Sequence, residues 1–153
     1  MNKDNLLQSA KALKQPGAEA LKEYSSKLDQ LISTMNNVML GREDIDALVG
    51  AQNIQMMKDN HANHARFMES VFNAYEPAIL VDTVLWVFRA YRSRHFSSTY
   101  WAAQMNTWIE IYREHLSEQC FKEILPFYKW MQVNIPIFNY LATEDFDAPF
   151  SVH

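Results

Sequence analysis

Glycine is scarce in this chain, with three residues in 153. The tight turns that join β-hairpin strands depend on Asn-Gly or Asp-Gly pairs, and the sequence contains neither. It also lacks segments in which β-branched and polar residues alternate, although 48% of its residues are apolar. These absences argue against a β-sandwich or barrel and predict an all-α fold, a single-domain helical bundle of about five to seven helices.

Other absences limit the class of protein. The single cysteine, Cys120, cannot form a disulfide within the chain, which favours a reducing compartment and predicts a cytoplasmic protein. No apolar segment has the length of a signal-peptide core or a membrane span, so we expect a soluble protein without membrane contact. The net charge of −4 argues against nucleic-acid binding, which depends on a basic surface.

Apolar residues recur at helical spacing along most of the chain, and glycine and proline divide the pattern. The predicted helices span 5–14, 18–41, 43–75 with an interruption at Gly50, 77–93, 97–116 and a last stretch from 117 that Pro126 kinks or restarts. The helix over 77–93 is apolar around most of its circumference, which predicts that it runs through the centre of the domain. Ser97 or Ser98, and then Ser117, are suited to cap the helices that follow them.

The pattern also predicts how the chain is organised. We expect N-terminal helices over 1–42, a helical core domain over 43–142 and a flexible tail over 143–153. In the first part, one helix face gathers an apolar stripe of Leu21, Leu28, Leu31, Ile32 and Met35. Because such a stripe can pair with a second copy across a two-fold axis, it predicts a homodimer.

The segment DNHANH, residues 59–64, places two histidines three positions apart. Successive residues of an α-helix are rotated by about 100°, so both histidines fall on one face, which we expect to point inward. This face consists of Ile54, Met57, His61, His64, Met68, Phe72 and Tyr75. We interpret the histidines as core residues hydrogen-bonded to Asn, Tyr or backbone groups. They border a predicted pocket for an apolar ligand, formed by His61, His64, Met68, Tyr91 and Trp108.

The alternative is a haem or metal site at His61 or His64, since one inward histidine is enough to ligate haem iron. A bundle metal site commonly adds carboxylates in Glu-x-x-His pairs, and the chain has no such pair. We therefore predict no metal ligands and no cofactor, with haem as the open alternative.

The segment FRAYRSRHF, residues 88–96, gathers Arg89, Arg92, Arg94 and His95 around a helix end. Cations there complement the negative end of the helix dipole. They are also suited to contact an anion or a protein partner, because arginine forks bind carboxylate and phosphate. No glycine-rich phosphate loop and no GxSxG motif occurs, so we predict that the protein is not an enzyme.

The segments VFRAYRSRHF and TYWAAQMNTW, which end one predicted helix and open the next, resemble the globin-like helical sensory domains of bacterial signalling proteins. The resemblance is to the non-haem globin N-terminal domain of stressosome sensors and covers residues 43–140. It implies a globin-like fold, dimerisation through terminal helices, and sensing or scaffolding without catalysis. The prediction is a non-enzymatic sensory or regulatory module that acts through a signalling partner protein or a small apolar ligand.

Overall fold

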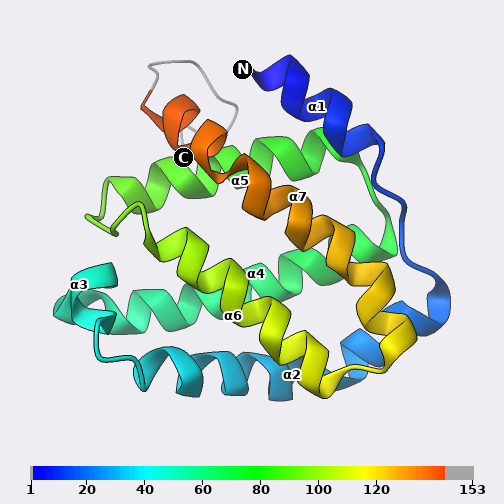
Figure 1. The fold of residues 1–153 in the computed structure, drawn as a ribbon, viewed down its shortest axis with the longest axis horizontal. Helices are drawn as coiled ribbons and strands as arrows, with labels where there is room; N and C mark the ends of the chain where they lie inside the picture. Colours follow the sequence, from blue (N-terminus) through cyan, green and yellow to red (C-terminus); the bar gives the residue numbers. More distant parts are fainter. Residues whose placement is uncertain (1, 144–153) are drawn as a thin grey trace.

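In the computed structural model, which describes residues 2–143, all regular structure is helical (Figure 1). The helices are α1 (Lys3–Lys11), α2 (Ala18–Leu40), α3 (Ile45–Val49), the 3₁₀ helix η1 (Ala51–Asn53), α4 (Ile54–Asn73), α5 (Pro77–Arg92), α6 (Tyr100–His115) and α7 (Glu118–Ala142). The predicted single all-α domain is confirmed. Beyond Thr143, the predicted tail lies outside the described residues.

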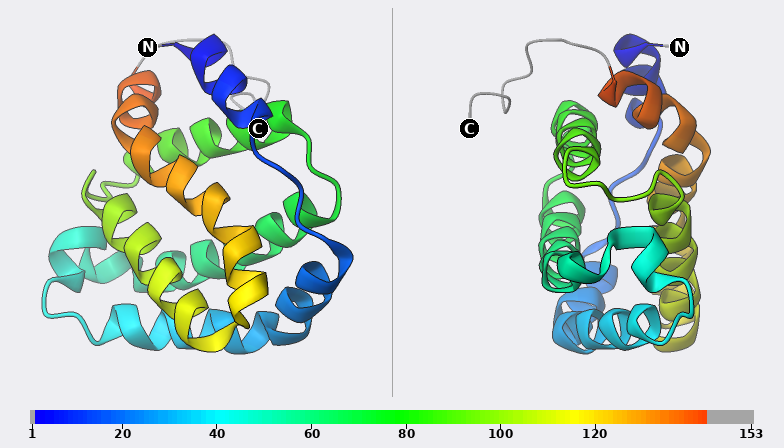
Figure 2. Two further views of the ribbon diagram at one scale, coloured as in Figure 1. Left: turned by 45° about the vertical axis from the view of Figure 1, so that its right-hand side comes forward. Right: turned by 90° about the vertical axis from the view of Figure 1, so that its left-hand side faces the viewer.

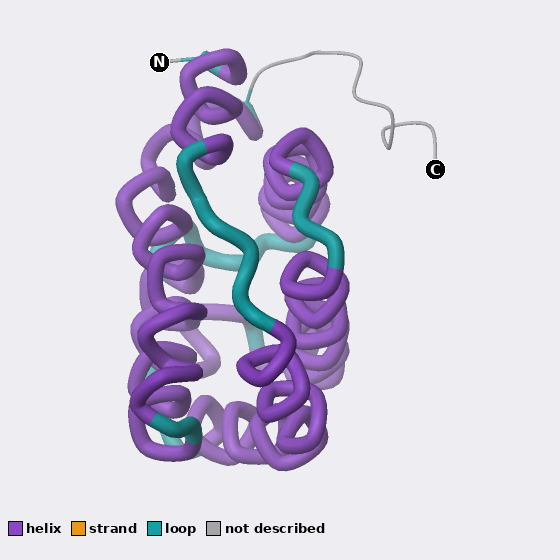
Figure 3. The backbone as a smooth tube through the Cα atoms, turned by 90° about the vertical axis from the view of Figure 1, so that its right-hand side faces the viewer, coloured by secondary structure: helices purple, strands orange, loops and turns teal. Residues whose placement is uncertain are grey.

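The helices form two layers, which Figures 2 and 3 show edge-on. Helices α2, α4 and α5 lie side by side in one layer, and α6 and α7 cross them in the other (Figures 1 and 2). Helix α2 packs against α4, α6 and α7, while α5 packs against α1 and α7. None of the helices in residues 2–143 combines the length and the apolarity that crossing a bilayer requires.

Several helix ends fall where the sequence signals predicted. Gly50 adopts φ 87°, a left-handed conformation that suits glycine, and it separates α3 from η1 and α4. Pro77 occupies the first turn of α5, where its missing N–H costs nothing. Ser117 caps α7, because its hydroxyl accepts the Cys120 N–H at 3.2 Å.

Two local signals need comment. Of the two outcomes predicted at Pro126, a restart does not occur, since α7 runs without interruption through Pro126 and Pro136. Both prolines are exposed, so each lost hydrogen bond falls on the outer side of a helix whose inner side is held by buried neighbours such as Phe127 and Tyr128. Neither serine caps α6, which begins at Tyr100 after Thr99.

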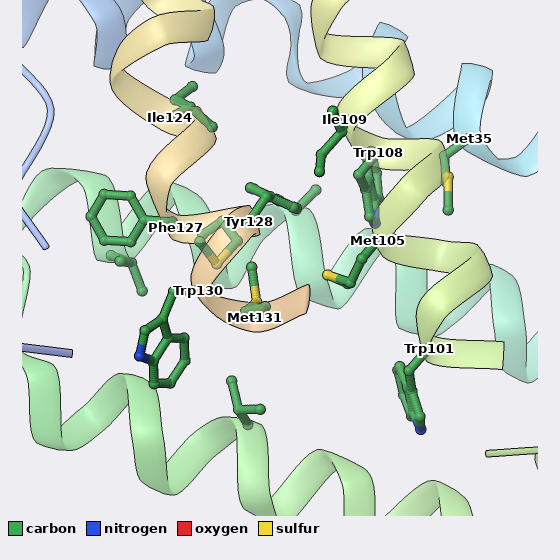
Figure 4. Packing of buried hydrophobic residues seen from close by; sticks show 14 of the residues in the cluster. Met35, Trp101, Met105, Trp108, Ile109, Ile124, Phe127, Tyr128, Trp130 and Met131 are labelled. Atoms are coloured by element: carbon green, nitrogen blue, oxygen red, sulfur yellow. The ribbon is translucent and has the colours of Figure 1, made fainter. Parts of the chain in front are cut away.

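The core fills the space between the layers. Figure 4 shows Met105 and Trp108 of α6 beside Tyr128 and Met131 of α7. The α2 stripe is part of this core: Leu31 and Met35 are fully buried, and the other three residues are partly buried against it. The stripe is therefore used within one chain and gives no support to a dimer, and the cut at residue 42 does not separate two structural units. The homodimer stays a prediction without this argument.

Helix α5 does not occupy the centre, so that prediction is also wrong. It lies at the edge of its layer (Figure 1), and Ile79 and Trp86 are 50% and 39% exposed. Its apolar circumference has a different cause. One side packs against α1 and α7, and another borders a cavity.

Candidate ligand-binding cavity

A cavity of about 500 Å³ lies between α4 and α5 and is bounded on its other side by α6 and α7. Its wall is mainly apolar. Aromatic and sulfur-containing side chains from all four helices dominate it, among them Phe67, Trp86, Phe88, Trp101, Phe138, Met68, Met105 and Met131. This volume is within the range of about 300–1,000 Å³ that is typical of sites for small ligands.

The cavity exists because α4 and α5 do not pack against each other along their lengths. Each is held by other helices, α4 by α2 and α5 by α1 and α7. Residues spaced three or four apart on α4, such as Asn60, His64 and Phe67, share the side that faces α5. On α5 the small side chains of Thr83 and Ala90 leave the space between the helices open.

Three of the five predicted pocket residues, His64, Met68 and Tyr91, line the cavity. His61 and Trp108 do not. His61 is fully buried behind the wall, and the Trp108 ring stacks on the His64 ring at 5.5 Å between centroids.

His61 uses both ring nitrogens for hydrogen bonds. Nδ1 lies 2.7 Å from Asn36 Oδ1, which can only accept, so the proton is on Nδ1. Nε2 then accepts from the Tyr100 hydroxyl at 3.2 Å. Burial lowers the pKa of His61 to about 4. The ring is therefore neutral near pH 7 and has no free nitrogen for a ligand.

A second set of polar contacts fixes the amide of Asn60. The Trp108 indole N–H can only donate, and it lies 3.3 Å from Gln104 Oε1. The Gln104 amide nitrogen must then be the donor to the Tyr100 hydroxyl at 2.8 Å and to Asn60 Oδ1 at 2.7 Å. These contacts identify which atom of the Asn60 side-chain amide is the oxygen and which is the nitrogen.

His64 reaches the cavity from the opposite side of this network. Its Nε2 lies 2.7 Å from the Tyr128 hydroxyl, which is 2.6 Å from that of Tyr112. Burial and, to a smaller extent, the neighbouring His61 lower the pKa of His64 to about 3. His64 therefore contributes a polar but uncharged surface to the cavity near pH 7.

Of the four residues of the basic corner, one belongs to the cavity, and their predicted contact with an anion or a protein partner stays a prediction. Arg94 lines the cavity, whereas Arg89, Arg92 and His95 do not. His95 adopts φ 69°, a left-handed conformation in the turn after α5. The Asn53 side chain donates to the Arg94 carbonyl at 3.0 Å, which helps fix this turn beside η1.

Within residues 2–143, no group of three or more His, Cys, Asp or Glu side chains could hold a metal ion. Cys120 is buried, and burial raises its thiol pKa to about 12. It therefore lacks the thiolate character of a reactive cysteine.

Sequence reasoning missed Asn60, Gln104 and the α7 residues Met131, Ile135 and Phe138. A signal for Asn60 existed, because it lies four positions before His64 and so on the same helix face. The comparisons with protein-family models, curated proteins and solved structures find no match to this chain.

Proposed function

We propose that this protein is a non-enzymatic sensory or regulatory module that binds a small apolar ligand in the α4–α5 cavity and acts through a protein partner. The cavity carries the proposal. An apolar chamber walled by four helices and interrupted by a few polar groups is the usual form of a small-molecule site.

The position of α5 suggests how ligand binding in the cavity would affect a protein partner on the outside. Trp86 lines the cavity and is also 39% exposed on the outside. A ligand that fills the space between α4 and α5 would change the packing of Trp86 and so the outer surface of α5, which also presents Ile79. The globin-like, stressosome-type sensor remains our proposal for the kind of module, on the order of helices over residues 43–140.

The haem alternative is less well supported. His61 has both ring nitrogens engaged, and the Nε2 of His64 is held by the Tyr128 hydroxyl. This leaves His64 Nδ1, the nitrogen crowded by its own Cβ, to meet an iron. Ligation through Nε2 would break the Tyr128 contact, and ligation through Nδ1 is hindered by the Cβ, so the residues present do not fit haem. A Soret band abolished by His64→Ala would reverse this judgement.

Filling the cavity should weaken the binding of an uncharged apolar dye. We expect N-phenylnaphthylamine to fluoresce on binding to the wild type, because the wall is mainly apolar. Ala90→Phe places a ring in the cavity and should weaken binding about tenfold or more. Ala78→Phe, on the same helix but exposed and outside the cavity, is the matched control and should bind as the wild type does.

Far-ultraviolet circular dichroism and thermal melting of both variants would show that they are folded. A wild type that does not enhance the dye, or an Ala90→Phe variant that binds it as well as Ala78→Phe does, would contradict the proposed function.

A further inference from the structure

We infer that the ligand is an apolar molecule that ends in a carboxylate, which the Arg94 guanidinium and the Asn60 amide recognise at one end of the cavity. This inference rests on the proposed binding function and adds the chemical class of the ligand.

Charge is the first argument. Arg94 is the one formally charged residue of the wall, and no Asp or Glu lines the cavity. Arg94 is exposed, and no ion pair within residues 2–143 includes it. Asp59 of α4 is exposed, accepts from Gln55 at 3.0 Å and is not part of the wall. The wall therefore contains no anion among the described residues and offers one cation that forms no ion pair there, although the charge of Asp59 acts on the lining residue Tyr91 from outside the wall.

The second argument is a donor that is only partly used. Asn60 is 4% exposed, and its carbonyl oxygen accepts from the Gln104 amide at 2.7 Å. Its side chain lines the cavity, where the Tyr91 hydroxyl can take at most one of its two N–H groups. The other N–H group is the one that we assign to the ligand.

Tyr91 adds a hydroxyl at the same end. Burial and the negative charge of Asp59 raise its phenol pKa, while the hydrogen bond with the Asn60 side chain and the charge of Arg94 act in the opposite direction. Asn60, Tyr91 and Arg94 therefore lie near one another and present N–H and O–H donors. A carboxylate, which only accepts, matches such a group better than a ligand that must donate.

The remaining wall suits an apolar body. Farther along α4 and α5 it is formed by side chains such as Phe67, Met68 and Val84, with Met131 and Phe138 from α7. One charged group and a mainly apolar remainder fit an aliphatic or aromatic carboxylic acid better than a sugar or a nucleotide.

Displacement of bound N-phenylnaphthylamine by decanoate and by decanol tests the inference. Decanol is the more apolar of the two, so an apolar cavity alone would favour it. We expect the wild type to prefer decanoate, because charge-assisted hydrogen bonds to Arg94 and Asn60 outweigh the loss of carboxylate hydration. Arg94→Gln should weaken decanoate binding about tenfold, leave decanol binding unchanged and so reduce or reverse the preference.

Arg92→Gln is the matched control, since it removes an exposed arginine two positions away that does not line the cavity. A wild type that binds dye but prefers decanol would overturn the carboxylate while leaving the binding function intact. Equal losses in Arg92→Gln and Arg94→Gln would also overturn it, because they would indicate general surface charge rather than this site. Failure of the dye itself to bind would instead remove the proposed function.

Discussion

Stability should fall steeply between about pH 6.5 and pH 4, because the two inward histidines must become protonated on unfolding. The pKa of His61 is lowered from 6.5 to about 4 and that of His64 to about 3. In this window the unfolded chain binds more protons than the folded one, so acid favours unfolding. Each histidine should contribute about 1.4 kcal/mol per pH unit, which is large against a typical total of about 5–15 kcal/mol.

Urea unfolding at a series of pH values measures this slope. His64→Phe should remove about half of it, since phenylalanine can still stack on Trp108 and Tyr128 keeps its contact with Tyr112. His95→Asn is the control, because it removes an exposed histidine and keeps a residue type tolerated at positive φ. The carboxyl of Glu123, whose pKa the Gly17 N–H lowers from 4.5, acts mainly at the low end of this window and equally in wild type and variant. Parallel slopes in wild type and His64→Phe would contradict the account.

Trp108→Ala should destabilise the protein by about 3–5 kcal/mol, at the upper end of the cost of truncating a core aromatic. Trp108 is fully buried and contacts the rings of His61, His64 and Tyr112. Its loss also leaves Gln104 Oε1 without the indole N–H that fixes its amide. Chemical denaturation measures the difference in free energy of unfolding.

Phe88→Ala is the informative comparison. Phe88 is 6% exposed and stacks on Trp101 at 4.6 Å, but it borders the cavity. Truncation of Phe88 enlarges an existing space and removes fewer contacts. We therefore expect the free energy of unfolding to fall by about 3 kcal/mol, the lower end of the range for a core aromatic. A larger loss for Phe88→Ala than for Trp108→Ala would mean that Phe88 is closely packed on all sides and that no cavity borders it.

The inward face of α4 could be read from periodicity alone. Met57, His61, Met68 and Phe72 are buried as the 3.6-residue repeat predicts, and His64 is half-buried on the same side. The interpretation of both histidines as hydrogen-bonded residues is likewise confirmed by their Asn and Tyr partners. The repeat fixes which side of a helix faces inward, and buried polar groups must then find partners.

The cavity could not be read in this way. An apolar circumference, as on α5, predicts contact with apolar surroundings but does not distinguish a packed neighbour from an empty space. The space depends on how far α1 and α7 hold α5 from α4, which is a property of tertiary packing. The orientation of the Asn60 amide depends on Gln104 and Trp108, 44 and 48 positions later in the chain, and no local pattern records that link.

The central claim, that the space between α4 and α5 takes up an apolar ligand, is tested most directly by diffraction from crystals grown with decanoate brominated at its terminal carbon. The account predicts one strong anomalous peak inside the cavity, among Met68, Met131 and Phe138, with the carboxylate density near Arg94 and Asn60. Bromine found only on the outer surface, or a cavity closed by direct contact of α4 with α5, would contradict it.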